Sequence, residues 1–431
     1  MDKKHLHSLI LEHQMRSNER LSLVPSENVL NISARMAFVS DILHRYSFPV
    51  DSGNNWSWPG SAELAEIEKE LQASLQRMFQ ARYINTKSIS GLNCMTIALA
   101  ALTRPDITVF SIAQEDGGHG STAFVSKKLG LRIEFLPINP HDFSIDLEKA
   151  CQQLRHCQGR KVIYLDQFMC LFPHDLRRLR EVAGEDCIIH YDGSHTMGLI
   201  AGGQFQDPLR EGADILAGST HKTYPGPHKG IIVTNNEALH ANIEENSMYF
   251  VSHHHAADIV ALALATQAFE ENREHYARQV ITNAQTLGNE LFERGFQVCA
   301  AHKGFTASHQ LWIDIANICH PFDASRLLLE TGIVVNAIDI PYIPSKLGVR
   351  LGTQEVTHLG MKETEMAEIA RIFEDVLIKN LPVEGARKRV CEMKAQFSTS
   401  LFDDDEFCDE LLALIWGGHH ERNLRDKIFR A

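Results

Sequence analysis

The sequence predicts an α/β protein in which a large domain with a mostly parallel sheet precedes a smaller α+β domain. The first reason is length, since 431 residues are enough for two or three domains with large cores. The second is that strand-like and helical runs alternate from residue 83 to residue 234, as they do in a parallel sheet covered by helices on both faces. The third is that the strand-like runs beyond residue 275 are shorter, with helical runs after them.

The first 60 residues have the character of an N-terminal arm. It opens with a polar amphipathic helix, continues through Ser26-Glu27-Asn28 and reaches the irregular stretch Asp51–Gly60. A helix is expected from Ala62 to about Gln80. Apolar residues recur there at helical spacing, namely Leu64, Ile67, Leu71, Leu75 and Met78.

Strands are expected wherever short apolar runs end in small or polar residues. After the strand-like Tyr83–Asn85, the large domain should hold Ile107–Ser111, Arg132–Ile138, Lys161–Asp166, Cys187–Asp192, Asp214–Gly218 and Gly230–Thr234. The small domain should hold Phe296–Ala300, Gln310–Ile315, Ile333–Ala337 and Val349–Gly352. We therefore divide the chain into an arm (1–60), a large domain (61–275) and a small C-terminal domain (276–431).

Composition excludes several classes of function. The formal net charge of −13 argues against binding to nucleic acid or to an anionic membrane surface. The nine cysteines are odd in number and form no C-x-x-C pair, so a reducing, cytoplasmic setting is expected rather than a disulfide framework. The N-terminus does not resemble a signal peptide, and no stretch is long and apolar enough to span a bilayer.

Two charged residues indicate a cofactor site. Lys222 comes shortly after the strand-like run Asp214–Gly218, and Asp192 ends the apolar run that starts at Cys187. Open α/β sheets place ligands at such strand ends. A lysine can form a Schiff base with the aldehyde of pyridoxal 5'-phosphate, and an aspartate can keep the pyridine nitrogen protonated, so that the ring accepts electrons. The pair therefore predicts a pyridoxal phosphate enzyme, although a solvated ion pair is the simpler alternative.

Two glycine-containing turns add to this constellation. Ser90 and Gly91 precede a helical run, where backbone N–H groups and a hydroxyl can bind a phosphate, although they also suit an ordinary helix start. In Asp116-Gly117-Gly118-His119-Gly120 the glycines allow a close approach of the backbone, which leaves His119 free to stack on a flat ring. The alternative for His119 is a surface turn.

At this point the chain resembles a known family, the serine hydroxymethyltransferases. Five of that family's motifs recur in order over nearly the whole chain: Pro25-Ser26-Glu27-Asn28, Gly117-Gly118-His119, Asp192-Gly193-Ser194-His195, Thr220-His221-Lys222-Thr223 and Arg350-Leu351-Gly352-Thr353. The resemblance implies an aminotransferase-like pyridoxal phosphate fold, with active sites shared between the two subunits of a homodimer.

The resemblance also implies roles for single residues. Lys222 would carry the cofactor, Asp192 would pair with the pyridine nitrogen, and His119 would stack on the ring. His195 would bond the ring hydroxyl, while Ser90 and Gly91 would hold the phosphate. Arg350 would bind the substrate carboxylate with two parallel hydrogen bonds. Further expected contacts are Thr220, His221 and Gly230 for the cofactor, Ser26 and Trp58 for the substrate carboxylate, and Tyr46 for the neighbouring subunit's site.

Two departures argue against a folate-dependent reaction. The family's Tyr-Ala-Glu-Gly-Tyr motif reads Tyr46-Ser47-Phe48-Pro49 here, so that Phe48 replaces its glutamate. The nearby Asp51 is a candidate substitute, but nothing in the sequence indicates that it takes this role. The loop Ile340–Gly348, before Arg350, is shorter than the loop with which the folate enzymes help to hold folate.

Several segments look instead like the L-threonine transaldolases of natural-product biosynthesis. These segments are Leu165-Asp166-Gln167, Gly198–Gly203, His221–Pro227, Gly304–Gln310 and Asp409–Ala413. Transaldolases cleave L-threonine to acetaldehyde and a bound glycyl carbanion, which adds to an acceptor aldehyde and gives a β-hydroxy-α-amino acid. Such an enzyme has to protect the carbanion from water and acids, and Phe48 in place of an acid suits that need.

The alternatives are a hydroxymethyltransferase acting on serine or an α-substituted serine, a threonine aldolase, and a non-catalytic cofactor-binding protein. Aromatic, aliphatic and nucleoside aldehydes all stay open as acceptors. No metal is expected, because the side chains of His253-His254-His255 diverge and no cysteine or carboxylate pattern completes a site. A phosphate or substrate contact and a simple helix-start role are both open for this triplet.

Overall fold

The computed structural model describes residues 2–47, 62–104 and 106–416. Its centre is a seven-stranded sheet in the order β2-β10-β9-β8-β7-β3-β4. The strands, in the order of the chain, are β2 (Tyr83–Asn85), β3 (Thr108–Ser111), β4 (Arg132–Phe135), β7 (Lys161–Leu165), β8 (Ile188–Asp192), β9 (Ile215–Ser219) and β10 (Gly230–Thr234). All run parallel except β10, which is antiparallel to both of its neighbours. The mostly parallel sheet predicted from the sequence is confirmed.

Alternate residues of the strands supply two hydrophobic cores, one on each face of the sheet. On one face Val109 and Ile215 pack with α4 (Gly91–Leu102) and α10 (Glu237–Phe250). On the other face Phe110 and Leu216 pack with a larger layer of helices. That layer consists of α3 (Ala62–Phe79), α6 (Leu147–His156), α7 (Leu176–Ala183), α8 (Met197–Ala201), α11 (Ala256–Glu270) and α12 (Arg273–Glu293).

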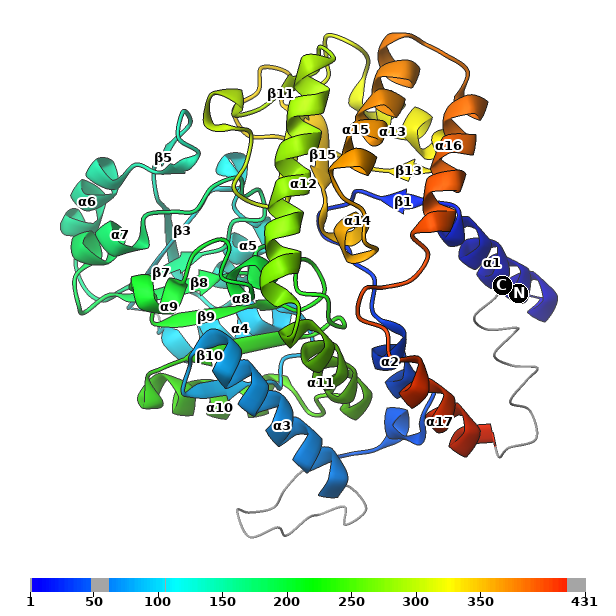
Figure 1. The fold of residues 1–431 in the computed structure, drawn as a ribbon. Helices are drawn as coiled ribbons and strands as arrows, with labels where there is room; N and C mark the ends of the chain where they lie inside the picture. Colours follow the sequence, from blue (N-terminus) through cyan, green and yellow to red (C-terminus); the bar gives the residue numbers. More distant parts are fainter. Residues whose placement is uncertain (1, 48–61, 105, 417–431) are drawn as a thin grey trace.

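A second sheet lies at the other end of the long helix α12 (Figure 1). Its order is β11-β12-β15-β14, and all of its pairs are antiparallel. The strands are β11 (Gln297–Val298), β12 (Gln310–Asp314), β14 (Asn336–Asp339) and β15 (Leu347–Gly352). The helices of this region are α13 (Pro321–Thr331), α14 (Gln354–His358), α15 (Glu363–Phe373) and α16 (Val383–Gln396). Because α12 contributes to the cores at both of its ends, the domain boundary at residue 275 stays a prediction.

The N-terminal segment reaches across the molecule to this second region. After α1 (Lys3–Asn18), strand β1 (Leu21–Ser22) pairs in parallel with β13 (Ile333–Val334). Helix α2 (Ile32–Arg35) then packs against α11, and α17 (Asp405–Trp416) packs against α2. The remaining elements are α5 (Gly120–Lys128), α9 (Pro208–Glu211) and the small hairpin β5–β6 (Ile138–Asn139, Ser144–Ile145).

Three predicted strands needed correction. Arg132–Ile138 ends at Phe135, because Pro137 has no N–H to donate to the ladder, and Ile138 starts the hairpin β5–β6. Phe296–Ala300 is only two residues long, since the left-handed φ of 58° at Ala300 starts a 3₁₀ turn. Ile333–Ala337 is split between β13 and β14, which pair with different partners.

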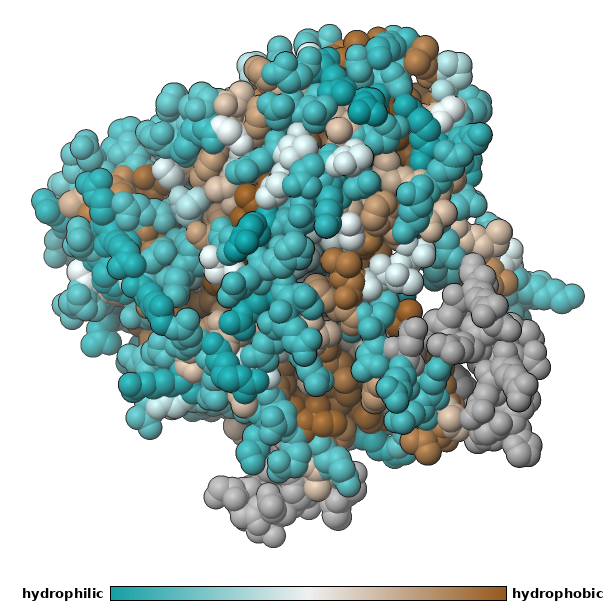
Figure 2. Space-filling view, viewed as in Figure 1, coloured by the Kyte–Doolittle hydropathy of each residue, from teal (hydrophilic) through white to brown (hydrophobic). Residues whose placement is uncertain are grey.

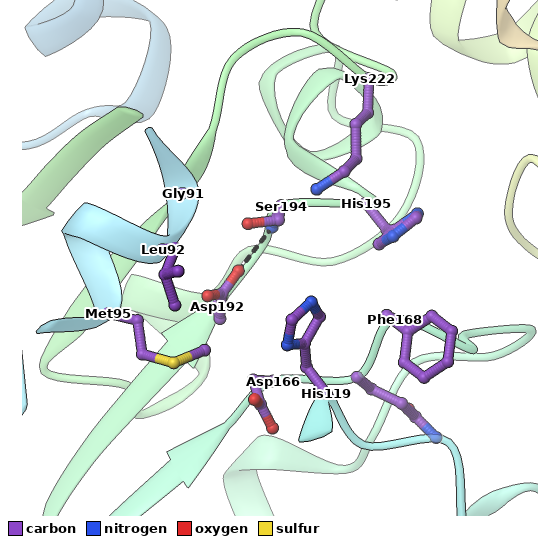
Figure 3. A pocket seen from close by; sticks show the side chains of 11 residues that line it. Gly91, Leu92, Met95, His119, Asp166, Phe168, Asp192, Ser194, His195 and Lys222 are labelled. Carbon is purple, nitrogen blue, oxygen red and sulfur yellow. Dashed lines mark hydrogen bonds between the residues drawn. The ribbon is translucent and has the colours of Figure 1, made fainter. Parts of the chain in front are cut away.

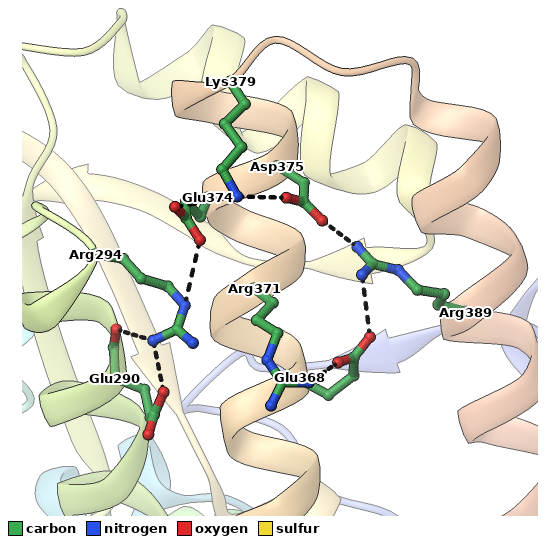
Figure 4. A network of polar contacts seen from close by, with 8 residues as sticks. All are labelled: Glu290, Arg294, Glu368, Arg371, Glu374, Asp375, Lys379 and Arg389. Carbon is green, nitrogen blue, oxygen red and sulfur yellow. Dashed lines mark hydrogen bonds and ion pairs between the residues drawn. The ribbon is translucent and has the colours of Figure 1, made fainter.

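Charged side chains connect the outer helices of the second region (Figure 4). In the centre, Arg389 of α16 pairs with Glu368 at 3.3 Å and with Asp375 at 2.7 Å. The whole network joins Glu290, Arg294, Glu368, Arg371, Glu374, Asp375, Lys379 and Arg389. Most of these side chains are partly exposed, so the network fixes the orientation of the helices more than it adds to stability.

Most of the face shown in Figure 2 is hydrophilic, but apolar side chains gather over α11. Behind them lies a small core made by α2, α3 and α11, with Ile67 and Leu264 partly buried against it. No helix among the described residues is long and apolar enough to cross a membrane.

Candidate active site

The site lies at the edge of the large sheet where β3, β7, β8 and β9 end. The loops that follow these parallel strands meet there, as they do in other open α/β sheets. They enclose a cavity (Figure 3) that is lined by Gly91, Leu92, Met95, His119, Asp166, Gln167, Phe168, Asp192, Ser194, His195 and Lys222. Five residues predicted from the sequence, Lys222, Asp192, His119, His195 and Gly91, thus share one cavity.

Lys222 lies in the turn after β9, with its amine turned into the cavity. Its Nζ donates to Ser219 Oγ at 2.8 Å, and its carbonyl oxygen accepts from Asn28 Nδ2 at 2.6 Å. Burial lowers the pKa of the Lys222 ammonium to about 8, against the opposing effect of Asp192. A substantial fraction of the amine is therefore uncharged near neutral pH, as a nucleophile requires.

Asp192 ends β8 and presents its carboxylate to the same cavity. Oδ1 accepts from the backbone N–H of Ser194 at 2.9 Å, and Oδ2 accepts from the Tyr164 hydroxyl at 3.5 Å. Burial raises the pKa of Tyr164 well above its usual value, so this phenol stays a donor. The carboxylate is thereby held in one orientation.

His119 stands at the start of α5, with its ring between Asp192 and Phe168 in Figure 3. Its backbone N–H donates to the carbonyl oxygen of Asp166 at 3.0 Å, and its Nδ1 accepts from the N–H of Ser121 at 3.2 Å. A Cβ at the preceding Gly118 would overlap the carbonyl group of Ile112, so only glycine fits there. Burial lowers the pKa of His119, which leaves a neutral ring suited to stacking.

His195 lines the cavity and is buried. Its Nδ1 lies 3.1 Å from Gln310 Nε2, and its carbonyl oxygen accepts from Thr223 Oγ1 at 2.8 Å. Since that amide nitrogen can only donate, Nδ1 is the acceptor and the ring proton belongs on Nε2. Burial holds the pKa of His195 well below its usual value.

The predicted phosphate residues begin α4. Ser90 Oγ accepts from the N–H of Asn93 at 3.1 Å, which makes Ser90 the helix N-cap. Gly91 lines the cavity, where a Cβ would meet the Cβ of Ser219 at 3.1 Å. The N-terminus of a 12-residue helix therefore faces the cavity.

Besides Ser90, three further predicted cofactor residues are not among the described residues that line the cavity. The Thr220 hydroxyl donates to the carbonyl oxygen of Pro227 at 2.7 Å, and His221 stacks on His228 with ring centroids 3.9 Å apart. Gly230 begins β10 and packs so closely on Cys94 that no side chain would fit. These residues shape the Lys222 turn in this structure.

Arg350 adjoins the cavity from β15 of the second region. Its Nε and Nη2 donate to Asn336 Oδ1 at 3.1 and 2.8 Å, and its Nη1 donates to the carbonyl oxygen of Phe168 at 3.3 Å. Burial lowers the pKa of the guanidinium to about 10, so it stays charged at neutral pH. A Cβ at Gly352, two residues after Arg350, would meet Pro25, so the segment that leads into Ser26 packs against the end of β15.

Tyr46 is 47% exposed, and its ring lies 4.2 Å from that of His253. It is not among the described residues that line this cavity. Trp58, Phe48 and Asp51 lie outside the described residues.

Around the histidine triplet, His254 Nε2 lies 3.0 Å from Glu68 Oε2, and its carbonyl oxygen accepts from the buried Lys229 Nζ at 3.0 Å. His255 lies 3.2 Å from Asp258 in the first turn of α11. Within the described part of the chain, no group of three or more His, Cys, Asp or Glu residues could hold a metal ion.

The site residues that sequence reasoning missed include Asp166, Phe168, Ser194 and Asn336. Asp166 ends an apolar run just as Asp192 does, and this pattern was the one available signal for it. An aromatic residue such as Phe168 carries no comparable signal, because sequence alone does not separate a cavity wall from a core residue.

The donor set suits pyridoxal phosphate. An amine with a lowered pKa, a fixed carboxylate and a neutral imidazole ring face one cavity, with a helix N-terminus beside them. These groups match the aldehyde, the pyridine nitrogen, the ring face and the phosphate of that cofactor.

Comparisons with known proteins agree with this assignment. The family model described as serine hydroxymethyltransferase matches residues 1–373. The serine hydroxymethyltransferase of Methanocaldococcus jannaschii is 36% identical over 402 residues, covering 90% of this chain and 92% of the relative. The L-threonine:uridine-5'-aldehyde transaldolase of an Amycolatopsis species is 36% identical over 375 residues, covering 84% and 90%.

A solved structure is similar over almost the whole chain. The crystal structure of L-threonine transaldolase from Pseudomonas fluorescens in the internal aldimine state matches with a TM-score of 0.86 and 29% identity, covering 96% of this chain and 97% of that one. The predicted aminotransferase-like fold and the cofactor are thereby confirmed. The chain belongs to the serine hydroxymethyltransferase family and is a pyridoxal phosphate-dependent enzyme of the transferase and aldolase type.

Proposed function

We propose that this protein is an L-threonine transaldolase. It cleaves L-threonine to acetaldehyde and a bound glycyl unit, and it joins that unit to an acceptor aldehyde to give a β-hydroxy-α-amino acid. The transaldolases from Pseudomonas fluorescens and Amycolatopsis support this proposal. Many other relatives are named serine hydroxymethyltransferase, so folate-dependent cleavage of serine is the second candidate.

The observation that carries the proposal is the closed position of the short loop Ile340–Gly348. The Tyr342 hydroxyl donates to Asp116 Oδ1 at 2.9 Å, and Pro341 lies against Gly117, two residues before His119. The loop thus closes onto the turn that carries the stacking histidine. The resemblance assigns folate binding to a longer loop at this place, and a closed short loop favours a reaction without folate.

The roles of the residues follow from their positions. We propose that Lys222 carries the cofactor, that Asp192 holds the proton on its pyridine nitrogen, and that His119 stacks on its ring. Arg350, held by Asn336, would bind the substrate carboxylate through its remaining N–H groups. When bound, pyridoxal phosphate supplies an electron sink for the pair of electrons left by the broken Cα–Cβ bond.

The surrounding residues orient the reaction and exclude water. A fixed carboxylate position sets which bond of the α-carbon lies across the ring plane, and that choice determines which bond breaks. Leu92 and Met95 line the cavity from α4, and Phe168 lines it from the loop after β7. Such apolar walls disfavour the transfer of a proton to the α-carbon.

The test is the visible spectrum of the holoenzyme before and after addition of L-threonine, followed by aldehydes of the aromatic, aliphatic and nucleoside classes. We expect a spectral change with threonine, release of acetaldehyde, and a new β-hydroxy-α-amino acid detected by mass spectrometry. Free glycine alone, whatever aldehyde is added, would identify a threonine aldolase. Cleavage of serine that depends on tetrahydrofolate would identify a hydroxymethyltransferase.

We also propose that two copies of the chain share their active sites as a homodimer. Large apolar side chains are exposed at the end of α10, where Met248 is 74% and Tyr249 71% accessible. Leu92, at the cavity, is 51% accessible. A second copy would cover such surfaces, and it would bring its own Tyr46 to this cavity. A reducing, cytoplasmic setting and a role in natural-product biosynthesis belong to the same proposal, the first supported by nine free cysteines.

A further inference from the structure

We propose that Phe168 determines the fate of the glycyl unit. Its ring forms the wall that keeps water from the α-carbon, so that the unit is transferred to an aldehyde and not released as glycine. This inference rests on the proposed transaldolase function, because it concerns the partition between two outcomes at the same site.

The ring of Phe168 lies beside His119 and His195 (Figure 3), and it also contacts Arg350. It makes an edge contact with His119, with ring centroids 5.9 Å apart and an interplanar angle of 80°, and its centroid lies 6.4 Å from that of His195. The Arg350 guanidinium carbon lies 5.2 Å from the ring centroid. Phe168 therefore fills the space between the histidine expected on the cofactor ring and the arginine expected on the substrate carboxylate.

This position brings Phe168 close to the reacting atom. The α-carbon of the substrate is bonded to the carboxylate, and through the amine it is joined to the cofactor. Any substrate that spans these two anchors has to place its α-carbon between them, beside the Phe168 ring. An aromatic ring there occupies volume that water would otherwise fill.

Hydrogen bonds fix the backbone that carries the Phe168 ring. The carbonyl oxygen of Phe168 accepts from Gln310 Nε2 at 2.9 Å and from Arg350 Nη1 at 3.3 Å. The next residue, Met169, donates its N–H to the carbonyl oxygen of Gly117 at 3.1 Å. Phe168 is thus a fixed part of the cavity and not the tip of a loose loop.

The nearest acid in the same loop is turned to other partners. The carboxyl group of Asp166 is hydrogen-bonded by the hydroxyls of Ser111 and Thr122. Water is therefore one source of a proton for the α-carbon, beside the Lys222 amine that faces the same cavity, and it is the source that Phe168 would exclude.

Two balanced outcomes compete after the Cα–Cβ bond of threonine breaks and acetaldehyde leaves. In transfer, the electron pair on the α-carbon forms a bond to the carbonyl carbon of the acceptor, and the acceptor oxygen takes the proton that the threonine hydroxyl lost. In release, the α-carbon takes a proton and glycine leaves, so that threonine gives acetaldehyde and glycine with no other reactant.

The test compares the holoenzyme with its Phe168→Ala and Phe168→Leu variants, using L-threonine and benzaldehyde. The readout is the ratio of glycine to β-hydroxy-α-amino acid. We expect Phe168→Ala to raise this ratio roughly tenfold, and Phe168→Leu, which keeps an apolar side chain, to raise it by no more than about threefold. Phe172→Leu is the matched control, since this aromatic residue of the same loop packs on Phe143 with centroids 6.1 Å apart, away from the cavity lining, and should leave the ratio unchanged.

Two further measurements separate this role from support of Arg350. The first is exchange of the glycine α-proton in deuterium oxide, followed by NMR, which should also rise about tenfold in Phe168→Ala. The second is the dissociation constant of glycine, from titration of the cofactor absorbance. A weaker affinity for glycine with an unchanged ratio and unchanged exchange would overturn the proposal, since the ring would then only orient the guanidinium.

The outcomes also separate this inference from the proposed function. If the wild-type enzyme transfers nothing to any aldehyde, the transaldolase proposal fails. The exchange measurement still tests whether Phe168 keeps water from the α-carbon. Faster exchange in Phe168→Ala would then support water exclusion, and equal exchange would overturn it. If Phe168→Ala does not fold with bound cofactor, Phe168→Leu carries the test, with an expected rise in exchange of about twofold.

Discussion

Two aspartates at the ends of neighbouring strands have different surroundings. Asp192, at the end of β8, accepts from the backbone N–H of Ser194 and faces the cavity with its carboxylate. Asp166, directly after β7, is 4% exposed and takes hydrogen bonds from the hydroxyls of Ser111 and Thr122. Burial, and next to it the charge of Asp192, raises the pKa of Asp166 well above its usual value. Burial thus favours the protonated form of Asp166, whereas the carboxyl group of Asp192 is presented to the cavity.

The first prediction concerns the replacement of Asp166. Asn keeps the hydrogen-bonding capacity of the protonated acid, and we expect Asp166→Asn to retain the fold and the cofactor. Asp166→Ala leaves the buried hydroxyls of Ser111 and Thr122 without their partner, which should cost about 2 kcal/mol of stability. The measurement is urea unfolding of the three proteins, with Asp142→Ala, at an exposed turn, as the control.

The stability of the wild type and that of Asp166→Asn should also depend differently on pH. An acid whose pKa is raised on folding contributes most below its unfolded pKa, near 3.8, and this contribution is lost as the pH rises toward the folded value. We therefore expect the stability of the wild type relative to Asp166→Asn to fall as the pH rises above 3.8 and through the folded pKa of Asp166. A difference that is constant over this range would show that Asp166 does not titrate in the folded protein.

At this scale the sequence predicted the charged residues of the site better than its walls. Lys222, Asp192 and His119 stand in motifs whose residue types are needed by the chemistry, and the cavity brings them together. Phe168 reaches the cavity only because the loop after β7 is held by Gln310, a residue distant in sequence. Contacts of that kind depend on tertiary structure and leave no mark in the local pattern.

At the scale of elements, strand positions were predictable and strand pairings were not. Apolar runs located the six strands after β2, but the antiparallel direction of β10 and the split of Ile333–Ala337 depend on which neighbour each strand meets. The pairing of β13 with β1 joins segments about 300 residues apart, and no local signal reports it. Pro137 and the left-handed Ala300 show the opposite case, where a single residue decides the end of a strand.

The loop between β14 and β15 is the element on which the proposed function depends most. It contains two non-glycine residues in the left-handed region, Tyr342 with φ 66° and Lys346 with φ 60°. Such conformations persist where surrounding contacts stabilise them. The hydrogen bond from Tyr342 to Asp116 supplies one of these contacts, and it joins the loop to the turn before His119.

The second prediction tests this contact with a double-mutant cycle of Tyr342→Phe and Asp116→Ala. We expect a coupling of about 1 kcal/mol in the free energy of unfolding, because each single variant already breaks the same hydrogen bond. The control pair is Tyr249 and Glu245, a tyrosine–carboxylate contact of 3.0 Å on an exposed helix face, where a smaller coupling is expected. Additive effects at Tyr342 and Asp116 would mean that the loop is closed by other contacts.

At the scale of the whole molecule, the N-terminal segment connects its distant parts. Strand β1 pairs with β13 in the second region, and six residues further on Asn28 Nδ2 donates to the carbonyl oxygen of Lys222 at 2.6 Å. Asn28 Oδ1 in turn lies 3.1 Å from Nδ1 of His358, at the end of α14. The lysine turn is therefore held by both the arm and the second region, so the geometry of the site depends on how the whole chain is assembled.

In the proposed homodimer, Tyr46 would extend this dependence to a second copy of the chain. It lies in the arm, is 47% exposed and contacts the His253 ring, and it is not among the described residues lining the cavity of its own chain. If it serves the neighbouring subunit, each active site combines Lys222 from one copy with Tyr46 from the other. That arrangement can be tested with two variants that are inactive for different reasons.

The last prediction is that activity returns when Tyr46→Phe and Lys222→Ala subunits are unfolded together and refolded as a mixture. A hybrid dimer then has one site in which both residues are intact and one in which both are changed. Random pairing makes half of the dimers hybrids, so about a quarter of the wild-type activity should appear. Each variant refolded alone is the control and should stay inactive. If Tyr46 served the site of its own chain, every site in the mixture would lack one of the two residues, and no activity would return.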